Sequence, residues 1–342
     1  MGPAPATDDV PRDADVCVLA WTRISARQSD LAQQLGGDTK IVYPEGRASN
    51  NKVVRYLLSA KETVAFLRHA AYGVLIVTAP PVETAMLCAL FRRRSKPFIL
   101  DSHPGAFGLS GDTHSERLQF LHRWLWRKAE CVLVTTPELA DLVGRGGGRG
   151  LVFHEPPPPW STQEFASISG EQESETRSRV CVPFIFTRDE PVDTLVAAAR
   201  LIPSVEFRVT GNPDRLPTTI EIPENVTLLG FLDSKQFLQE MHDADAILVL
   251  STEPQSVMRT AYEAVRLERP LIVSDTAATR RYFPHAVHTA TTGHAIFESV
   301  QQLMAEPVPT RKDRTALALA ISTQTTDGQM AELRERIAAS GS

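Results

Sequence analysis

The stretch that decides the fold is ILVLSTEPQSVMRTAYEAVRLERPLIVSD, residues 247–275. It begins with an apolar run that ends at the polar pair Ser251-Thr252, and residues 271–273 are apolar again. Between the two runs, residues 257–267 have the composition of a helix. The stretch therefore predicts a buried strand, a polar loop, a helix, a turn and a second buried strand, which is the repeating unit of a parallel α/β sheet.

The polar loop from Glu253 to Ser256 predicts a ligand site. In parallel α/β folds, ligands bind beyond the carboxyl ends of the strands. The start of the following helix offers unpaired N–H groups and a partial positive charge, which suit a phosphate. Glu263 follows Arg259 by four residues, so we expect their side chains to pair on one helix face. Glu263 is then either a ligand-binding acid or a solvated surface acid.

The same alternation of short apolar strands and helical segments runs along both halves of the chain. The predicted strands of the first half are residues 15–20, 41–43, 73–78, 97–100, 131–135 and 152–153. Those of the second half are residues 182–186, 206–210, 226–229, 247–250 and 271–273. The predicted helices are residues 27–35, 52–68, 83–94, 115–129, 137–143, 191–201, 234–244 and 257–267. This alternation predicts two Rossmann-like, doubly wound α/β domains in tandem.

Changes in composition mark the expected domain boundaries. Residues 1–13 are rich in Pro, Ala and Asp and predict a disordered tail. Residues 14–155 form the first domain. Residues 156–179 begin with four prolines and continue with Ser and Glu, as in a linker. The second domain is residues 180–305, and residues 306–342 form a helical tail.

Composition limits the classes of function and the compartment. A net charge of −5 argues against a nucleic-acid binder with a basic surface. No apolar run reaches the ~18 residues that span a bilayer, and the first residues do not resemble a secretory signal. The four cysteines are scattered in or beside apolar runs, which predicts buried thiols in a reducing compartment. We therefore expect a cytoplasmic protein.

Several common site motifs are missing from the sequence. The nine histidines include no HxxxH or HxH spacing, so no metal site is expected. There is no GxSxG elbow, no GxxxxGK[ST] loop, and no GxGxxG after the first strand. The sequence therefore predicts neither a metal nor a bound cofactor.

Residues 255–264 (QSVMRTAYEA), followed by RPLIVSD at residues 269–275, resemble the donor-binding signature of family-4-like (group 1) glycosyltransferases. That family has the GT-B fold, in which two Rossmann-like domains face each other across a cleft. Glu263 matches the signature's second acid, which in the family binds the ribose of a sugar nucleotide. Gln255 stands in place of the first acid, which contacts the donor sugar. Glu253 lies two residues earlier and would substitute only if the loop is shifted.

The resemblance extends to other donor-binding positions. It implies that Ser256 and Arg259 belong to the donor site, together with the turn Gly211-Asn212. The strand that leads to Phe231 resembles one after which the family's backbone groups meet the nucleobase. Arg188 stands where the family places a basic residue for the diphosphate. Its usual lysine partner is absent, and the acids Asp189, Glu190 and Asp193 follow instead.

In the first half, Asp101-Ser102-His103 resembles the end of a strand in the family where a histidine contacts the donor sugar. The resemblance implies catalytic roles for His103 and Asp101, along with Gln255. Asp101 is either a general base for an acceptor hydroxyl or a cap for the next loop, and His103 is either functional or a packing residue. LDSHPGAF, VTTPELA, FTRDEPVDTL and RTAYEAV resemble bacterial enzymes that act on cell-surface or polysaccharide acceptors.

These observations predict a glycosyltransferase that moves a sugar from a nucleotide-diphosphate sugar to a hydroxyl acceptor in cell-surface or extracellular polysaccharide synthesis. Resemblance implies a metal-independent enzyme and favours anomeric retention. The alternatives are a GT-B homologue of little or no activity that acts as a scaffold, and a sugar-nucleotide epimerase. Residues 92–96 and 120–128 are basic, and the second segment is also aromatic. A peripheral membrane contact for a lipid-linked acceptor is a further hypothesis for these two segments.

Overall fold

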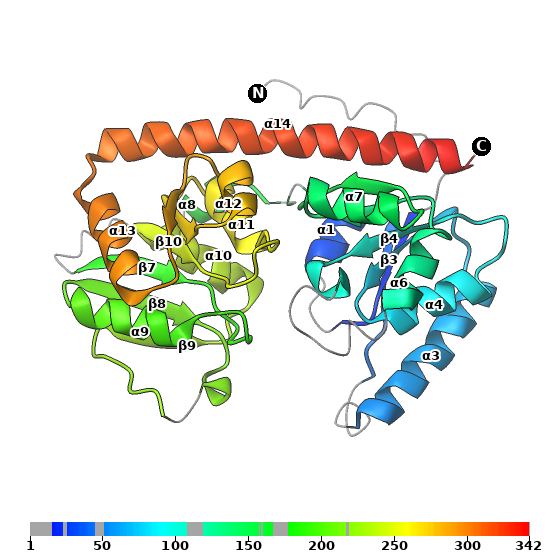
Figure 1. The fold of residues 1–342 in the computed structure, drawn as a ribbon, viewed down its shortest axis with the longest axis horizontal. Coiled ribbons are helices and arrows are strands. Elements are labelled where there is room, and N and C mark those ends of the chain that lie inside the picture. The colour runs from blue at the N-terminus through cyan, green and yellow to red at the C-terminus, as the bar shows by residue number, and fades with distance from the viewer. Residues whose placement is uncertain are drawn as a thin grey trace. The chain divides into compact units, whose positions relative to one another are not determined.

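The computed structural model describes residues 16–22, 26–44, 51–107, 119–156, 158, 160–166, 177–216 and 219–341 (Figure 1). The chain divides into two compact units, of which unit 1 is residues 1–159 with 326–342 and unit 2 is residues 160–325. The predicted disordered tail at residues 1–13 lies outside the described residues. No helix within the described ranges is both long enough and apolar enough to cross a membrane.

Unit 1 contains a six-stranded parallel sheet in the order β2-β1-β3-β4-β5-β6. Its strands are β1 (Val16–Ala20), β2 (Asp38–Ile41), β3 (Val74–Ala79), β4 (Phe98–Ser102), β5 (Val132–Val134) and β6 (Gly150–Val152). Every residue of β1, β3, β4 and β5 is buried, as expected of parallel strands with helices on both faces. Because β1 lies between β2 and β3, the sheet grows in both directions from its first strand.

Helices connect these strands. They are α1 (Ala26–Gln34), α3 (Lys52–His69), α4 (Val82–Phe91), the 3₁₀ helix η1 (Pro104–Phe107), α6 (Gln119–Trp126) and α7 (Pro137–Arg145). Local sequence explains two of their starts. The Asn51 side chain accepts hydrogen bonds from the N–H groups of Val53 and Val54 at the start of α3. Thr136 caps α7 in the same way, with Pro137 in the first turn.

Unit 2 contains a second six-stranded parallel sheet, in the order β12-β11-β10-β7-β8-β9. Its strands are β7 (Ser178–Val182), β8 (Val205–Thr210), β9 (Val226–Gly230), β10 (Ala246–Val249), β11 (Leu271–Ser274) and β12 (Val287–Thr289). Its helices are α8 (Gln163–Ala166), α9 (Val192–Leu201), η2 (Pro213–Arg215), α10 (Ser234–Asp243), α11 (Arg259–Arg266), α12 (Ala277–Tyr282) and α13 (Gly293–Ala305). The two doubly wound α/β domains are as predicted, although the short edge strand β12 was not.

The buried core also includes the cysteines. All four cysteines are buried with free thiols, which confirms the interpretation of them as buried thiols. Burial raises the pKa of the Cys17 thiol to about 11, so it stays protonated at neutral pH.

The predicted linker at residues 156–179 is partly structured. Helix α8 lies inside it, and Phe165 of α8 is buried in the core of unit 2 with its ring edge-to-face against Trp160. The hydroxyl of Thr162 donates to the carbonyl of Arg266 at 2.9 Å. The strand β7 also begins within the predicted linker. These residues therefore belong to unit 2, while residues 167–176 lie outside the described part of the chain.

The predicted helical tail is one helix, α14 (Val308–Gly341), and it serves both units. Ala318 and Leu319 pack against the core of unit 2. Met330, Leu333 and Ile337 are part of the core of unit 1, beside strands from the first half of the chain. The tail is therefore not a separate region, because its last third completes the first domain.

We predict that Leu333→Ala destabilises the protein by about 2–5 kcal/mol, because it removes a fully buried leucine and leaves a cavity. Chemical denaturation, followed by circular dichroism, measures the effect. Leu317→Ala is the control on the same helix, since Leu317 is 49% exposed, and it should change the unfolding free energy little. Equal effects of the two substitutions would contradict this packing of α14.

Candidate functional site

In unit 2 the site begins where β7 and β10 lie side by side, since the chain leaves these two strands toward opposite ends of the sheet. The loops that follow them are residues 183–191 and 250–258. Asp189 joins the two loops. Its carboxylate accepts a hydrogen bond from the Ser251 hydroxyl at 2.8 Å, and its carbonyl accepts one from the Thr252 N–H at 2.8 Å. The two predicted site loops are thus in direct contact.

The loop after β7 presents Arg188. Glu190 is buried at its base, where its carboxylate accepts hydrogen bonds from the N–H groups of Ile185 at 3.0 Å and Thr187 at 2.9 Å. Burial raises the pKa of Glu190, against the lowering effect of these hydrogen bonds. Asp189 and Glu190 thus both accept hydrogen bonds from other residues of the two loops, whereas the Arg188 side chain is exposed. Among the described residues, neither acid forms an ion pair with Arg188.

Gly211 lets the loop after β7 pack on the end of β8. Its φ is +109°, and a Cβ placed there would lie 2.6 Å from the carbonyl oxygen of Phe184 and 2.9 Å from the Phe186 ring. The neighbouring Asn212 caps η2, because its side chain accepts from the N–H of Asp214 at 3.1 Å. The structure thus gives both residues a role in shaping the turn. Phe231, at the end of β9, is 69% exposed.

The loop after β10 forms a small pocket against the loop after β11. Its polar lining consists of Ser251, Glu253, Ser256, Ser274, Thr276 and Thr279. The N–H of Ser251 donates to the Ser274 hydroxyl at 2.9 Å, which fixes one loop against the other. Burial, followed by the charge of Asp189, raises the pKa of Glu253. Glu253 thus supplies the carboxylate that lines this pocket.

Helix α11 carries Glu263 inward. The helix begins at Arg259, two residues later than predicted, and Met258 at its cap provides no side-chain hydrogen bond. Glu263 is 8% exposed, and its Oε1 lies 2.8 Å from the Nε of Arg259. The predicted pairing at a spacing of four residues is therefore confirmed. Because Glu263 is buried, it is not a solvated surface acid.

In unit 1 the strand end at Asp101 is held by an ion pair that the sequence does not predict. Asp101 is buried, and its two oxygens accept from Nε of Arg27 at 3.2 Å and from Nη2 at 3.0 Å. Burial acts to raise the pKa of Asp101, but the Arg27 charge, the proximity of His103 and the Arg27 hydrogen bond outweigh it and lower the pKa. A carboxylate that is ionised, has a lowered pKa and accepts two hydrogen bonds from an arginine makes a weak general base.

His103 lies beside this ion pair. Its Nε2 is 3.9 Å from an Asp101 oxygen, and its side chain is 39% exposed. Desolvation lowers its pKa, and the nearby Arg27 charge acts in the same direction, whereas Asp101 and Glu155 act to raise it. The imidazole is therefore neutral at physiological pH, and it can either donate or accept a hydrogen bond. This form suits contact with a sugar hydroxyl better than stabilisation of an anion.

The same network reaches the end of the first domain and helix α14. Arg27 also pairs with Glu155 at 2.9 Å and donates to the carbonyl of His154. Nε2 of His154 donates to the Thr135 carbonyl at 2.8 Å, so its Nδ1 accepts from the Gln329 amide at 3.0 Å. No local pattern marks these residues, because they come from distant parts of the sequence. The tertiary structure alone brings them together.

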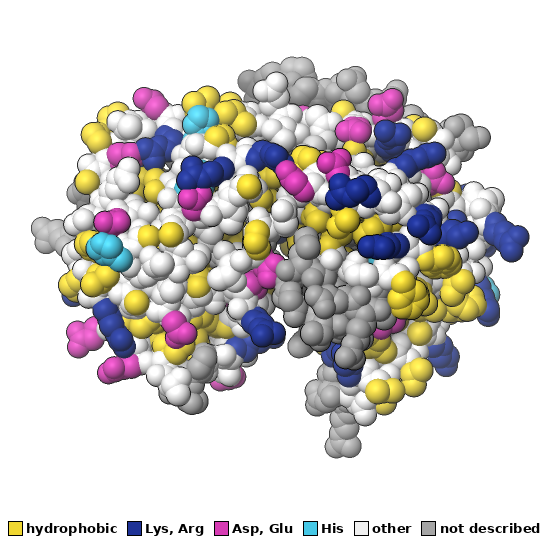
Figure 2. Space-filling model, in the orientation of Figure 1, with side chains coloured by type: hydrophobic (Ala, Val, Ile, Leu, Met, Phe, Trp, Pro, Cys, Tyr) yellow, Lys and Arg dark blue, Asp and Glu magenta, His cyan; other side chains and the backbone are white. Residues whose placement is uncertain are grey.

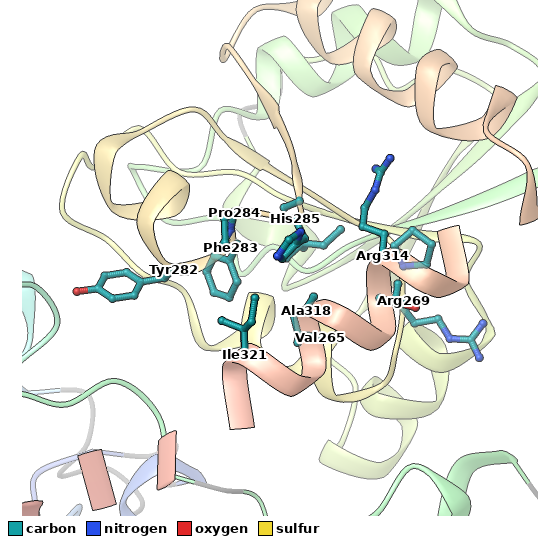
Figure 3. Close-up of a pocket in the computed structure, with 13 residues that line it drawn as sticks. Val265, Arg269, Tyr282, Phe283, Pro284, His285, Arg314, Ala318 and Ile321 are labelled. Atoms are coloured by element: carbon teal, nitrogen blue, oxygen red, sulfur yellow. The ribbon is translucent and has the colours of Figure 1, made fainter. Parts of the chain in front are cut away.

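A second pocket of unit 2 lies away from these loops. Figure 3 shows Val265, Phe283, Ala318 and Ile321 grouped around it, with Arg269 and Arg314 projecting outward. Its lining includes residues at the start of β11 and just before β12, at the amino ends of these strands. Because α/β sheets bind ligands at the carboxyl ends, this apolar pocket is not the donor site. Within the described ranges, no three His, Cys, Asp or Glu side chains cluster as a metal site would require.

Comparisons with known proteins agree with this architecture. Residues 10–152 match the family model of the glycosyl transferase 4-like domain. No curated protein matches the chain. Anabaena HepE, solved in complex with UDP and glucose, has a TM-score of 0.68 at 13% identity, over 94% of this chain and 99% of that one.

Two further solved structures are similar over their whole length. Sucrose-phosphate synthase from Thermosynechococcus elongatus has a TM-score of 0.68 at 14% identity, over 95% of this chain and 99% of that one. The E. coli trehalose-6-phosphate structure bound with UDP-2-fluoro glucose has a TM-score of 0.69 at 9% identity, over 94% and 99%. At these identities the likeness concerns the fold. It confirms the predicted GT-B fold, with its two parallel-sheet α/β domains.

We predict that Arg27→Met destabilises the protein by about 3–5 kcal/mol at pH 7, because the buried Asp101 and the half-buried Glu155 lose their cation. In the native protein, a carboxylate of lowered pKa adds stability that is complete above its unfolded pKa of about 4 and is lost as pH falls further. In the variant, burial instead raises the pKa of Asp101, so lowering the pH stabilises it relative to the native protein.

The difference in unfolding free energy between the two proteins should therefore narrow between pH 7 and pH 4, as measured by urea denaturation. The double variant Arg27→Met/Asp101→Asn removes both charges and should recover part of the loss. A difference that stays constant with pH would show that the ion pair does not account for the effect.

Proposed function

We propose that this chain, whose residues 10–152 match the family model of the glycosyl transferase 4-like domain, transfers a sugar from a nucleotide-diphosphate sugar to a hydroxyl acceptor. The observation that carries the proposal is the buried Glu263, held by Arg259 on the helix that follows β10. This helix starts beside the point where the sheet changes direction, which is where α/β sheets bind nucleotides. The complexes of HepE with UDP-glucose and UDP support a UDP-sugar as the first donor to test.

The leaving diphosphate sets the electrostatic requirement of the reaction, since negative charge builds there as the glycosidic bond breaks. We assign its stabilisation to Arg188 and to the N–H groups that open α11, which Met258 leaves without a side-chain cap. Glu263 accepts hydrogen bonds from the ribose. The exposed ring of Phe231 and the turn at Gly211-Asn212 lie at the neighbouring strand ends, where a nucleobase can bind.

The donor sugar needs a hydrogen-bond acceptor for its hydroxyl groups. Gln255 takes the place of the family's acid, and an amide binds hydroxyls without adding charge. Glu253 lines the pocket beside Ser256, which supports a role for it next to Gln255. In unit 1, the neutral imidazole of His103 is able to hydrogen-bond a sugar hydroxyl, and the Arg27–Asp101 pair fixes the strand end that carries it.

The finer parts of the proposal follow the family resemblance. The reaction proceeds without a metal or a cofactor and with retention at the anomeric carbon. The acceptor binds to unit 1 and is a hydroxyl of a cell-surface or extracellular polysaccharide precursor, on the cytoplasmic side of the membrane. The runs LDSHPGAF and RTAYEAV support this choice of acceptor class.

A GT-B homologue that binds a partner without catalysis is the second candidate. Two observations favour it: Gln255 replaces an acid, and acidic residues occupy the positions after Arg188 where a lysine is expected. A thermal-shift screen with UDP-, GDP-, dTDP- and ADP-sugars separates the two, since a ligand that binds only the native state raises the melting temperature. We expect one of these nucleotides to raise it, and no shift with any of them would favour the scaffold.

We predict that Glu263→Ala weakens binding of the donor by about 10- to 100-fold, because hydrogen bonds to a charged group contribute about 1.5–3 kcal/mol. Isothermal titration with the sugar nucleotide identified in the screen measures this, and transfer activity should fall at least as far. Glu298→Ala is the matched control, since Glu298 is also a helical acid with a partner four residues away, His294 at 3.3 Å, but it is exposed. Full transfer activity in Glu263→Ala would refute the assignment of the site.

A further inference from the structure

Helix α3 exposes an apolar face. Val53, Val54, Leu57 and Leu58 are each between 40% and 68% exposed, over the first two turns of the helix. At 100° per residue they share one side of the helix, whereas the buried Ser59, Thr63 and Leu67 occupy the other. The cap at Asn51 holds the start of the helix in place. Single exposed apolar residues are common, but four adjacent ones mark an interaction surface.

The exposed face continues onto the end of α4. The guanidinium of Arg68, near the end of α3, lies 5.9 Å from the centre of the Phe91 ring. Arg93 donates to the carbonyl of Arg68 at 3.2 Å, which ties the two helix ends together. Phe91 is 41% exposed and Leu90 is 59% exposed. We refer to Val53, Val54, Leu57, Leu58, Lys61, Arg68, Leu90, Phe91, Arg93 and Arg94 as the α3–α4 surface.

The charge on this surface is of one sign. Its charged members are Lys61, Arg68, Arg93 and Arg94. The sequence of α3 contains one acid, Glu62, which pairs with Lys40 at 2.6 Å. Helix α4 contains one acid, the half-buried Glu83, at its opposite end from Leu90 and Phe91. Residues 92–96 contain no acid. Figure 2 shows hydrophobic side chains gathered over α3 and α4 with Lys and Arg side chains among them. Exposed apolar side chains and cations thus occur together along α3 and at the end of α4.

We propose that the α3–α4 surface binds an anionic membrane. An apolar helix face bordered by Lys and Arg enters the boundary between headgroups and acyl chains, while the long cationic side chains reach the lipid phosphates. Clusters of four to eight such cations favour anionic lipids. A protein partner would have to combine an apolar face with many acidic groups, whereas an anionic bilayer offers both at any orientation. The α3–α4 surface therefore fits a bilayer better than it fits a folded partner.

The aromatic and basic residues 120–128, considered as a membrane contact from the sequence, do not form such a surface. Leu125 and Trp126 are fully buried in the core of unit 1, and the Trp126 ring stacks on Phe107. Phe120 is the large apolar side chain of this segment that is exposed, at 67%. Among residues 92–96, Arg92 is also used within the fold, because it lies over the Phe98 ring and donates to the carbonyls of Ala89 and Lys96.

Co-sedimentation of the full chain with vesicles tests the proposal. At low salt the protein should bind phosphatidylcholine vesicles that contain about 30% phosphatidylglycerol at least about tenfold more tightly than pure phosphatidylcholine, and 0.5 M NaCl should weaken the binding. Leu57→Glu/Leu58→Glu should reduce binding by about tenfold or more. Leu317→Glu, at an equally exposed leucine of α14, should leave it unchanged. Both variants should keep the native melting temperature, since all three leucines are exposed.

Three results would overturn the proposal. They are no binding to the anionic vesicles at low salt, unaltered binding by the double variant, and a native dimer that the double variant separates, which would show that a second copy covers the face. The contact needs no catalysis, so Glu263→Ala should bind the vesicles as the native protein does. A failure of the donor site and a failure of the membrane contact are thereby distinguishable. That the membrane supplies a lipid-linked hydroxyl acceptor rests on the proposed function.

Discussion

The constraint on which the site depends is the position of the first strand in each sheet. In unit 2, β7 lies between β8 and β10, so the chain must leave β7 toward one end of the sheet and return to its other side. After the loops that follow β7 and β10, the chain continues toward opposite edges of the sheet, and such loops face a common space. Asp189 holds the two loops together at this point through Ser251 and Thr252. The location of the site thus follows from strand order and not from any single motif.

Carboxylates near the strand ends of the two sheets have different roles because their surroundings differ. Glu190 is enclosed by backbone N–H groups and shapes its own loop, while Asp189 links two loops. Glu263 is buried against Arg259, and Asp101 is locked onto Arg27. A buried carboxylate is tolerated only with such partners. Counting acidic residues near a strand end therefore says little about catalysis until the partner of each acid is known.

Packing gives two apolar and basic segments of unit 1, helices α6 and α3, different surroundings. Trp126 and Leu125 are buried because the strands beside α6 offer an apolar face. Helix α3 packs through only one side, so Val53, Val54, Leu57 and Leu58 remain in water. Both segments are apolar and basic in sequence, and only the packing decides which of them is part of the core. The protein therefore retains an apolar, cationic surface on the domain to which we assign the acceptor.

The sequence by itself determined the two doubly wound domains, most of their strands, and the pairing of Arg259 with Glu263, because strand periodicity and helical spacing are local properties. It also placed Arg188, Gly211, Glu253 and Ser256 at strand ends. Only the tertiary structure decided that α14 completes unit 1 and that Arg27 neutralises Asp101. These contacts join residues up to 300 positions apart, such as Arg334 and Gln34. No local pattern encodes them, since their free energy exists only once the sheets have formed.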